Sequence, residues 1–107
     1  MNNNYLKLEQ DFFKREEIEK MMQQPMGKDM VTIYLKMMLL SINNQGFINH
    51  DSNTTLEEYL AAELEEDIEI IKKSLEYFQN EKLILTDMAY VFQKVSSEFF
   101  GGVFDEE

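Results

Sequence analysis

The stretch LEEYLAAELEEDIEIIKKSLEYFQN, residues 56–80, decides the fold that we predict for this chain. Its apolar residues recur at helical spacing on both sides of an acidic segment at residues 65–67, which predicts two helices joined by a short turn. Thr54 or Thr55 is placed to cap the first helix, with a glutamate three residues later to complete a capping box. The second helix, over about residues 68–80, has a predicted core stripe formed by Ile68, Ile71, Leu75 and Phe78.

Upstream, the chain predicts a buried central helix. Residues 30–42 carry a single charge, Lys36, and are apolar almost all round, which is typical of a helix buried on most sides. We expect Asp29 to be its N-cap. Residues 25–27, Pro-Met-Gly, separate it from a shorter helix, and the alternation at residues 5–9 predicts a short strand before that helix.

Downstream of the two helices, the pattern changes to that of a hairpin. Residues 83–86 and 90–92 are predicted as two strands, joined by a tight turn at residues 87–89. Phe and Ile at residues 47–48 form a very short predicted strand after the central helix. This order of elements predicts a mainly α fold with a small β-hairpin, a winged helix-turn-helix.

Composition limits the class of protein. A chain of 107 residues that is 44% hydrophobic forms one domain; we expect a winged helix over residues 1–98 and an apolar, then acidic, C-terminal tail over residues 99–107. The longest uncharged apolar run, residues 37–42, is too short for a membrane span, so we expect a cytoplasmic protein with no membrane contact. The absence of cysteine excludes disulfides and thiolate zinc sites, and a single histidine, His50, leaves no histidine pair for a metal.

The sequence also lacks the motifs of several classes of enzyme. It has no Gly-rich phosphate loop, no nucleophile elbow, no zinc-protease helix and no calcium loop. The acidic residues between 57 and 69 have the spacing of helix caps and solvated helix faces, and no segment is suited to building a cleft around two carboxylates. We therefore expect no enzyme, no cofactor, no metal site and no small-molecule substrate.

Four segments carry a resemblance to a known family: YLKLEQDFF at residues 5–13, IYLKMMLLS at residues 33–41, AAEL at residues 61–64 and LI at residues 83–84. They resemble the N-terminal domain of phage replisome organiser proteins, over about residues 5–92. That family is similar in fold to the winged-helix domains of Gram-positive primosomal initiation proteins. The resemblance implies a winged helix that takes part in starting DNA replication on a phage or mobile element, with origin DNA and replication-initiation proteins as partners.

The charge pattern bears on DNA binding. The start of the second helix of a helix-turn-helix normally reaches the base edges, yet here Glu57 to Glu69 include seven acids and no Lys or Arg. A carboxylate about 4–6 Å from a phosphate costs on the order of a kcal/mol even near a protein surface. The net charge of −11 also repels DNA. The candidate phosphate contacts are four lysines on or after the second helix, Lys72, Lys73, Lys82 and Lys94; alternatively, the first three form a solvated helix face.

A protein interface is the second hypothesis. Ile70 and Tyr77 lie off the predicted core stripe and are expected to form an exposed apolar shoulder. The termini add further candidates: Tyr5, Leu6, Phe12, Phe13, Phe99 and Phe100. Their apolar character predicts self-association, most simply as a two-fold homo-oligomer, in an acidic interaction module without direct DNA contact. The alternative is that the two termini pack against each other and close the core.

Overall fold

The computed structural model describes residues 5–44, 46–50, 53–87, 92–95 and 100–101. In chain order the elements are β1 (Tyr5–Leu6), η1 (Phe12–Lys14), α1 (Glu16–Met22), α2 (Gly27–Ser41), η2 (Ile42–Asn44), β2 (Phe47–Asn49), α3 (Leu56–Leu64), α4 (Ile68–Asn80), β3 (Ile84–Asp87), β4 (Phe92–Val95) and β5 (Phe100–Gly101). The helices predominate, and the strands are short.

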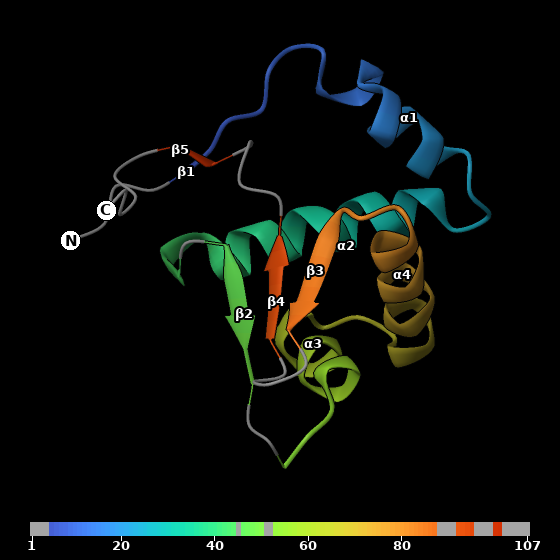
Figure 1. The fold of residues 1–107 in the computed structure, drawn as a ribbon. Coiled ribbons are helices and arrows are strands. Elements are labelled where there is room, and N and C mark those ends of the chain that lie inside the picture. Colours follow the sequence, from blue (N-terminus) through green and yellow to red (C-terminus); the bar gives the residue numbers. More distant parts are fainter. Residues whose placement is uncertain (1–4, 45, 51–52, 88–91, 96–99, 102–107) are drawn as a thin grey trace.

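The topology from α2 to β4 is that of a winged helix-turn-helix. Strand β4 pairs antiparallel with both β2 and β3, in the order β2-β4-β3, and α2 lies across one end of this sheet (Figure 1). Helices α3 and α4 form the helix-turn-helix between β2 and the β3–β4 hairpin. The predicted mainly α fold with a small β-hairpin is confirmed.

The bounds of α3 and α4 agree with the sequence prediction because both helices have strong local start signals. The hydroxyl of Thr55 accepts a hydrogen bond of 3.1 Å from the Glu58 amide, and the Thr55 amide donates one of 3.2 Å to the Glu58 carboxylate. This reciprocal pair is a capping box, and it satisfies two backbone donors that the first turn of α3 leaves open.

Helix α2 forms the centre of the core, as its apolar sequence predicts. Tyr34 is fully buried, and its ring lies 5.2 Å from that of Phe78 on α4. Burial of each such side chain stabilises the fold by about 1.5–3 kcal/mol. In the described part of the chain, neither α2 nor any other helix is long and apolar enough to span a membrane. Among the described residues, the other fully buried large side chains are Ile18, Met21, Ile33, Met37, Met38, Leu60, Ile71, Leu75 and Phe78.

The start of α2 differs from the prediction. The helix begins at Gly27, its N-cap is Met26 without a side-chain cap bond, and Asp29 lies in the first turn. The prediction of Asp29 as N-cap is therefore wrong. The physical reason is tertiary, because Gly27 is buried where α2 approaches the last turn of α1, and that contact extends the helix past its best local capping residue. Asp29 still faces the positive end of the helix dipole.

The second strand of the hairpin also differs from the prediction. Strand β4 covers Phe92–Val95 and so extends beyond residue 92, the predicted end, and residue 87, predicted in the turn, ends β3 and pairs with Phe92. Residues 88–91 lie outside the described residues. The register of β4 is set by two neighbours, with Lys94 opposite both Phe47 and Leu85, and local alternation does not carry this information.

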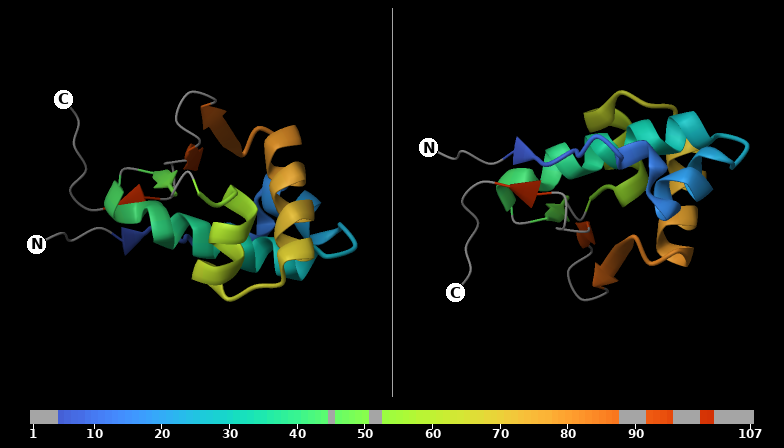
Figure 2. Two further views of the ribbon diagram at one scale, coloured as in Figure 1. Left: turned by 90° about the horizontal axis from the view of Figure 1, so that it is seen from below. Right: turned by 90° about the horizontal axis from the view of Figure 1, so that it is seen from above.

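The two ends of the described chain meet. Strand β1 pairs antiparallel with β5, with Tyr5 opposite Gly101 and Leu6 opposite Phe100. Both lie near the C-terminal end of α2, away from α4 (Figure 2), and Leu6 packs against the core. This favours the alternative in which the termini pack together. A separate tail at residues 99–107 stays a prediction, because the structure describes only two of those residues.

Candidate interface for nucleic acid and protein

The turn of the helix-turn-helix is built by a left-handed residue. Glu65 ends α3 with a φ of 56°, a backbone conformation that L-residues other than glycine adopt at a cost. Its amide donates to the carbonyl of Ala61, and so does the amide of Glu66, at 3.0 Å. These two bonds satisfy a carbonyl that the end of α3 would otherwise leave open.

Asp67 is the N-cap of α4. One oxygen of its carboxylate accepts hydrogen bonds from the amides of Glu69, at 2.8 Å, and Ile70, at 3.3 Å. A negative charge here also complements the helix dipole. The acidic load at the tip of the helix-turn-helix therefore has a structural cause in this position, independent of any partner.

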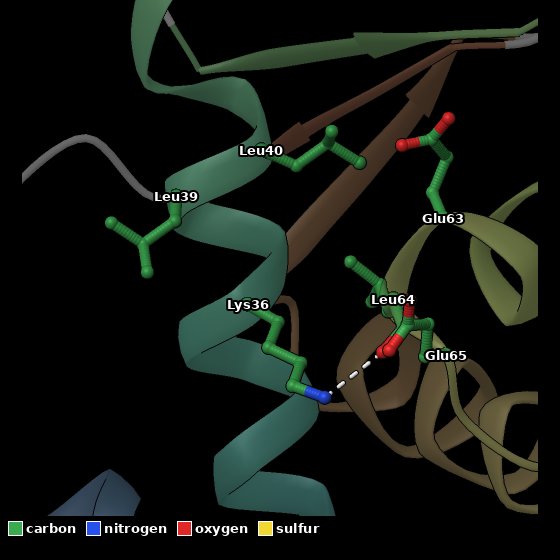
Figure 3. A pocket seen from close by; sticks show the side chains of 6 residues that line it. All are labelled: Lys36, Leu39, Leu40, Glu63, Leu64 and Glu65. Carbon is green, nitrogen blue, oxygen red and sulfur yellow. Dashed lines mark hydrogen bonds between the residues drawn. The ribbon is translucent and has the colours of Figure 1, made fainter.

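Lys36 ties the central helix to the turn. From α2, its ammonium group donates to the carbonyl oxygen of Leu64, at 2.9 Å, and to the carboxylate of Glu66, at 2.7 Å. Figure 3 shows the bond to Leu64, with Lys36 pointing from α2 toward the end of α3. The cation thus neutralises one tip carboxylate and caps the negative end of α3. Sequence reasoning missed this role, although a single charge in an apolar helix was the available signal.

The outer face of α4 carries mixed charge. Lys72 and Lys73 are exposed there, but so are Glu69 and Glu76, and the ammonium of Lys72 lies 3.6 Å from the carboxylate of Glu69. Exposed ion pairs of this kind contribute little to stability. Here the carboxylate of Glu69 offsets the positive charge of Lys72 that would otherwise attract a phosphate. The face is therefore less basic than its lysines alone suggest.

The other two candidate lysines flank the wing. Glu81 is the C-cap of α4, and the exposed Lys82 that follows it has a left-handed backbone with a φ of 61°. The amide of Lys82 donates to Gln79, and the next amide, of Leu83, donates to Phe78. Lys94 lies in the middle strand of the sheet, β4, and its side chain is outside the described part. The structure places Lys72 and Lys73 on α4 and Lys82 two residues after its end, and their contact with DNA stays a prediction.

The apolar shoulder predicted on α4 is not exposed. Ile70 and Tyr77 are half-buried and pack against the core. A helical wheel for α4 alone does not show that α1 also contacts this part of the chain. Lys20 of α1 donates a hydrogen bond of 2.8 Å to Glu81, directly after α4. Burial first, and then the charge of Glu81, raise the pKa of Tyr77. The prediction of an exposed shoulder on α4 is therefore wrong.

The N-terminal candidates divide into buried and exposed residues. Phe12 is only 3% exposed and belongs to the core, whereas Phe13 and Tyr5 are 57% and 54% exposed. Phe99 and the side chain of Phe100 lie outside the described residues. A partner surface at this end of the molecule would therefore use Tyr5 and Phe13.

The single histidine does not form part of a catalytic or metal-binding group that we can identify. His50 is half-buried, and its ring stacks on that of Tyr59 with centroids 6.0 Å apart. Within the described ranges, no three His, Asp or Glu side chains are grouped so that they could hold a metal ion.

Comparison with known proteins identifies the family. The model of the N-terminal phage replisome organiser family matches residues 5–99, which is most of the chain. The chain belongs to this family. A search of curated proteins gives no match, and neither does a search of solved structures. The organiser domain therefore has a role in phage replication initiation.

Proposed function

We propose that this organiser domain is a non-catalytic winged helix that assembles the phage replication-initiation complex through protein contacts, while another part of the complex holds the origin DNA. The observation that carries the proposal is the charge at the tip of the helix-turn-helix. Glu65, Asp67 and Glu69 are all exposed where a DNA-binding winged helix would meet the bases. Carboxylates there disfavour phosphate and favour a basic protein surface.

Self-association is part of the proposal. Tyr5 and Phe13 are large, more than half exposed and close in sequence, and a two-fold dimer is the commonest assembly of soluble chains. Such a dimer would present two acidic tips to the other replication-initiation proteins. Replacing Tyr5 and Phe13 with serine should then return the protein to a single-chain mass in light scattering.

Direct DNA contact is the second candidate. Its supporting observation is that Lys72, Lys73 and Lys82 are exposed on or next to α4, the helix that enters the major groove in this fold class. Together with Lys94 in β4, they would bind DNA phosphates without recognising the bases. This candidate requires affinity that falls steeply as salt concentration rises.

One experiment separates the two candidates. Fluorescence anisotropy of labelled duplex DNA is measured at low and physiological salt, with molar mass by light scattering on the same sample. The assembly role predicts no DNA binding even at low salt, together with a mass above one chain. Salt-sensitive binding that is lost in the Lys72→Ala, Lys73→Ala variant would instead establish the DNA-contact role.

A further inference from the structure

Leu39 is an exception on the central helix. Almost all the apolar side chains of α2 are buried or half-buried, yet Leu39 is 56% exposed. Leu40 beside it is half-buried. A leucine left in water on an otherwise buried helix marks a place where apolar contact is incomplete.

Leu39 lies at the edge of a hollow between α2 and the end of α3. The hollow has a volume of about 430 Å³ and is lined by Lys36, Leu39, Leu40, Glu63, Leu64 and Glu65. In Figure 3, Leu40 points across the hollow toward Glu63, whereas Leu39 leaves α2 on the side away from Glu63. We call this feature the α2–α3 hollow. Its apolar part comes from leucines on two helices, and its acidic part from the end of α3.

The rim of the α2–α3 hollow has an uncompensated negative charge. Among the lining residues that the structure describes, the one cation, Lys36, is bonded to Glu66 and to the carbonyl oxygen of Leu64. Three carboxylates, of Glu63, Glu65 and Glu66, against this one ammonium leave a net charge of −2. Glu63 and Glu65 are exposed and remain available to a partner's cations.

We propose that the α2–α3 hollow docks a basic amphipathic helix of another protein. Its apolar side chains would contact Leu39 and Leu40, and its Lys or Arg residues would face Glu63 and Glu65. A strip of apolar side chains between two helices is suited to binding a third helix. The acidic rim would fix the orientation of that helix and favours one with positive charge. The inference rests on the proposed assembly role and names the chemistry of the partner.

Charge argues against occupants from this chain itself. The sequence ends in Asp-Glu-Glu at residues 105–107, which the acidic rim repels. A second copy offers no basic amphipathic helix for this site, because its α1, α3 and α4 each carry at least as many acidic as basic side chains. A basic partner gains from both the local rim and the overall field, which also speeds its association at low salt.

The probe is a fluorescein-labelled helical peptide of about 14 residues, with leucines on one face and lysines on the other. Anisotropy measures its binding to the whole chain, and amide chemical shifts locate the site. We expect binding that weakens with salt and shifts that centre on the ends of α2 and α3. Leu39→Lys should weaken binding by roughly tenfold or more, and so should the double variant Glu63→Lys, Glu65→Lys.

The matched control is Leu85→Lys, because Leu85 on β3 is 61% exposed but does not line the hollow. It should bind the peptide like the natural chain. Equal affinity in Leu39→Lys, equal affinity for a peptide with glutamate in place of lysine, or shifts centred elsewhere would overturn the proposal. Since all these substitutions are at exposed positions, an unfolded variant is not expected, and circular dichroism checks each one.

Light scattering of the same variants separates this proposal from the assembly role. A mass above one chain that is kept in the absence of peptide binding would overturn the hollow as a docking site and leave the assembly role standing. A mass above one chain that Leu39→Lys alone abolishes would show that the hollow holds a second copy, and would overturn the basic partner.

Discussion

At the scale of single residues, Gly27 has the least freedom. A Cβ there would lie 2.4 Å from the carbonyl oxygen of Met22 and 2.6 Å from that of Met21. Both contacts are backbone, so α1 and α2 would have to separate. We expect Gly27→Ala to lower the free energy of unfolding by about 1–3 kcal/mol, measured by urea denaturation. Lys28→Ala, at the exposed next position, is the control and should change it by less than about 0.5 kcal/mol. Equal midpoints would contradict this close approach.

Glu65 offers the opposite test at the same scale. Its φ of 56° is unfavourable for a residue with a Cβ and suits glycine. We expect Glu65→Gly to raise the free energy of unfolding by about 0.5–1 kcal/mol in thermal denaturation. Glu63→Gly, inside the last turn of α3, is the control and should lower it by about 1 kcal/mol. Destabilisation by both variants would rule out the left-handed turn.

At the scale of elements, Lys36 is the link between α2 and the helix-turn-helix. Lys36→Met keeps a long apolar stem but removes the bonds to Leu64 and Glu66. Because Lys36 is partly exposed, we expect a loss of only about 1 kcal/mol in the free energy of unfolding, with faster amide exchange confined to the α3–α4 turn. Lys28→Met, on the same helix, should leave that turn unchanged. Uniform exchange across the chain would argue against a local link.

The elements that the sequence predicts best are those with local signals. The bounds of α3 and α4 follow from caps and a 3.6-residue period, both of which are written within a few residues. The start of α2 and the extent of β4 are predicted less well, because Gly27 is positioned by α1, and β4 pairs with both β3 and the distant β2. Contacts between elements decide such details, and no single segment records them.

The same division holds for the candidate interface. The acidic tip can be predicted from the sequence alone. The contacts of its carboxylates within the protein cannot, since Lys36 bonds to Glu66, which lies 30 positions further along the chain. Tyr77 packs against the core although it lies off the predicted stripe, and Leu39 is exposed although it lies in the most apolar helix. Helical periodicity gives one face for each helix, whereas a helix in this fold has several neighbours.

At the scale of the whole molecule, stability should fall in alkaline solution. The hydrogen bond and charge of Glu81 raise the pKa of Lys20, and burial followed by the charge of Glu81 raise that of Tyr77, from ordinary values of 10.5 and 10.0. A raised pKa in the folded state contributes stability below the unfolded value and loses it as pH passes the folded value. We expect urea midpoints to decrease above pH 10, with a shallower decrease in Tyr77→Phe. Identical slopes would contradict the assignment.

The last prediction concerns how the whole charge distribution acts on DNA. If tip carboxylates, rather than the net charge of −11, keep this winged helix off DNA, then Glu65→Gln with Glu69→Gln should raise affinity at low salt by roughly tenfold. The change also releases Lys72 from its ion pair. Glu16→Gln with Glu19→Gln on α1 alters the net charge equally and is the control. Equal gains in both variants would show that long-range repulsion dominates. A gain in neither variant would contradict the view that the tip carboxylates keep this domain off DNA.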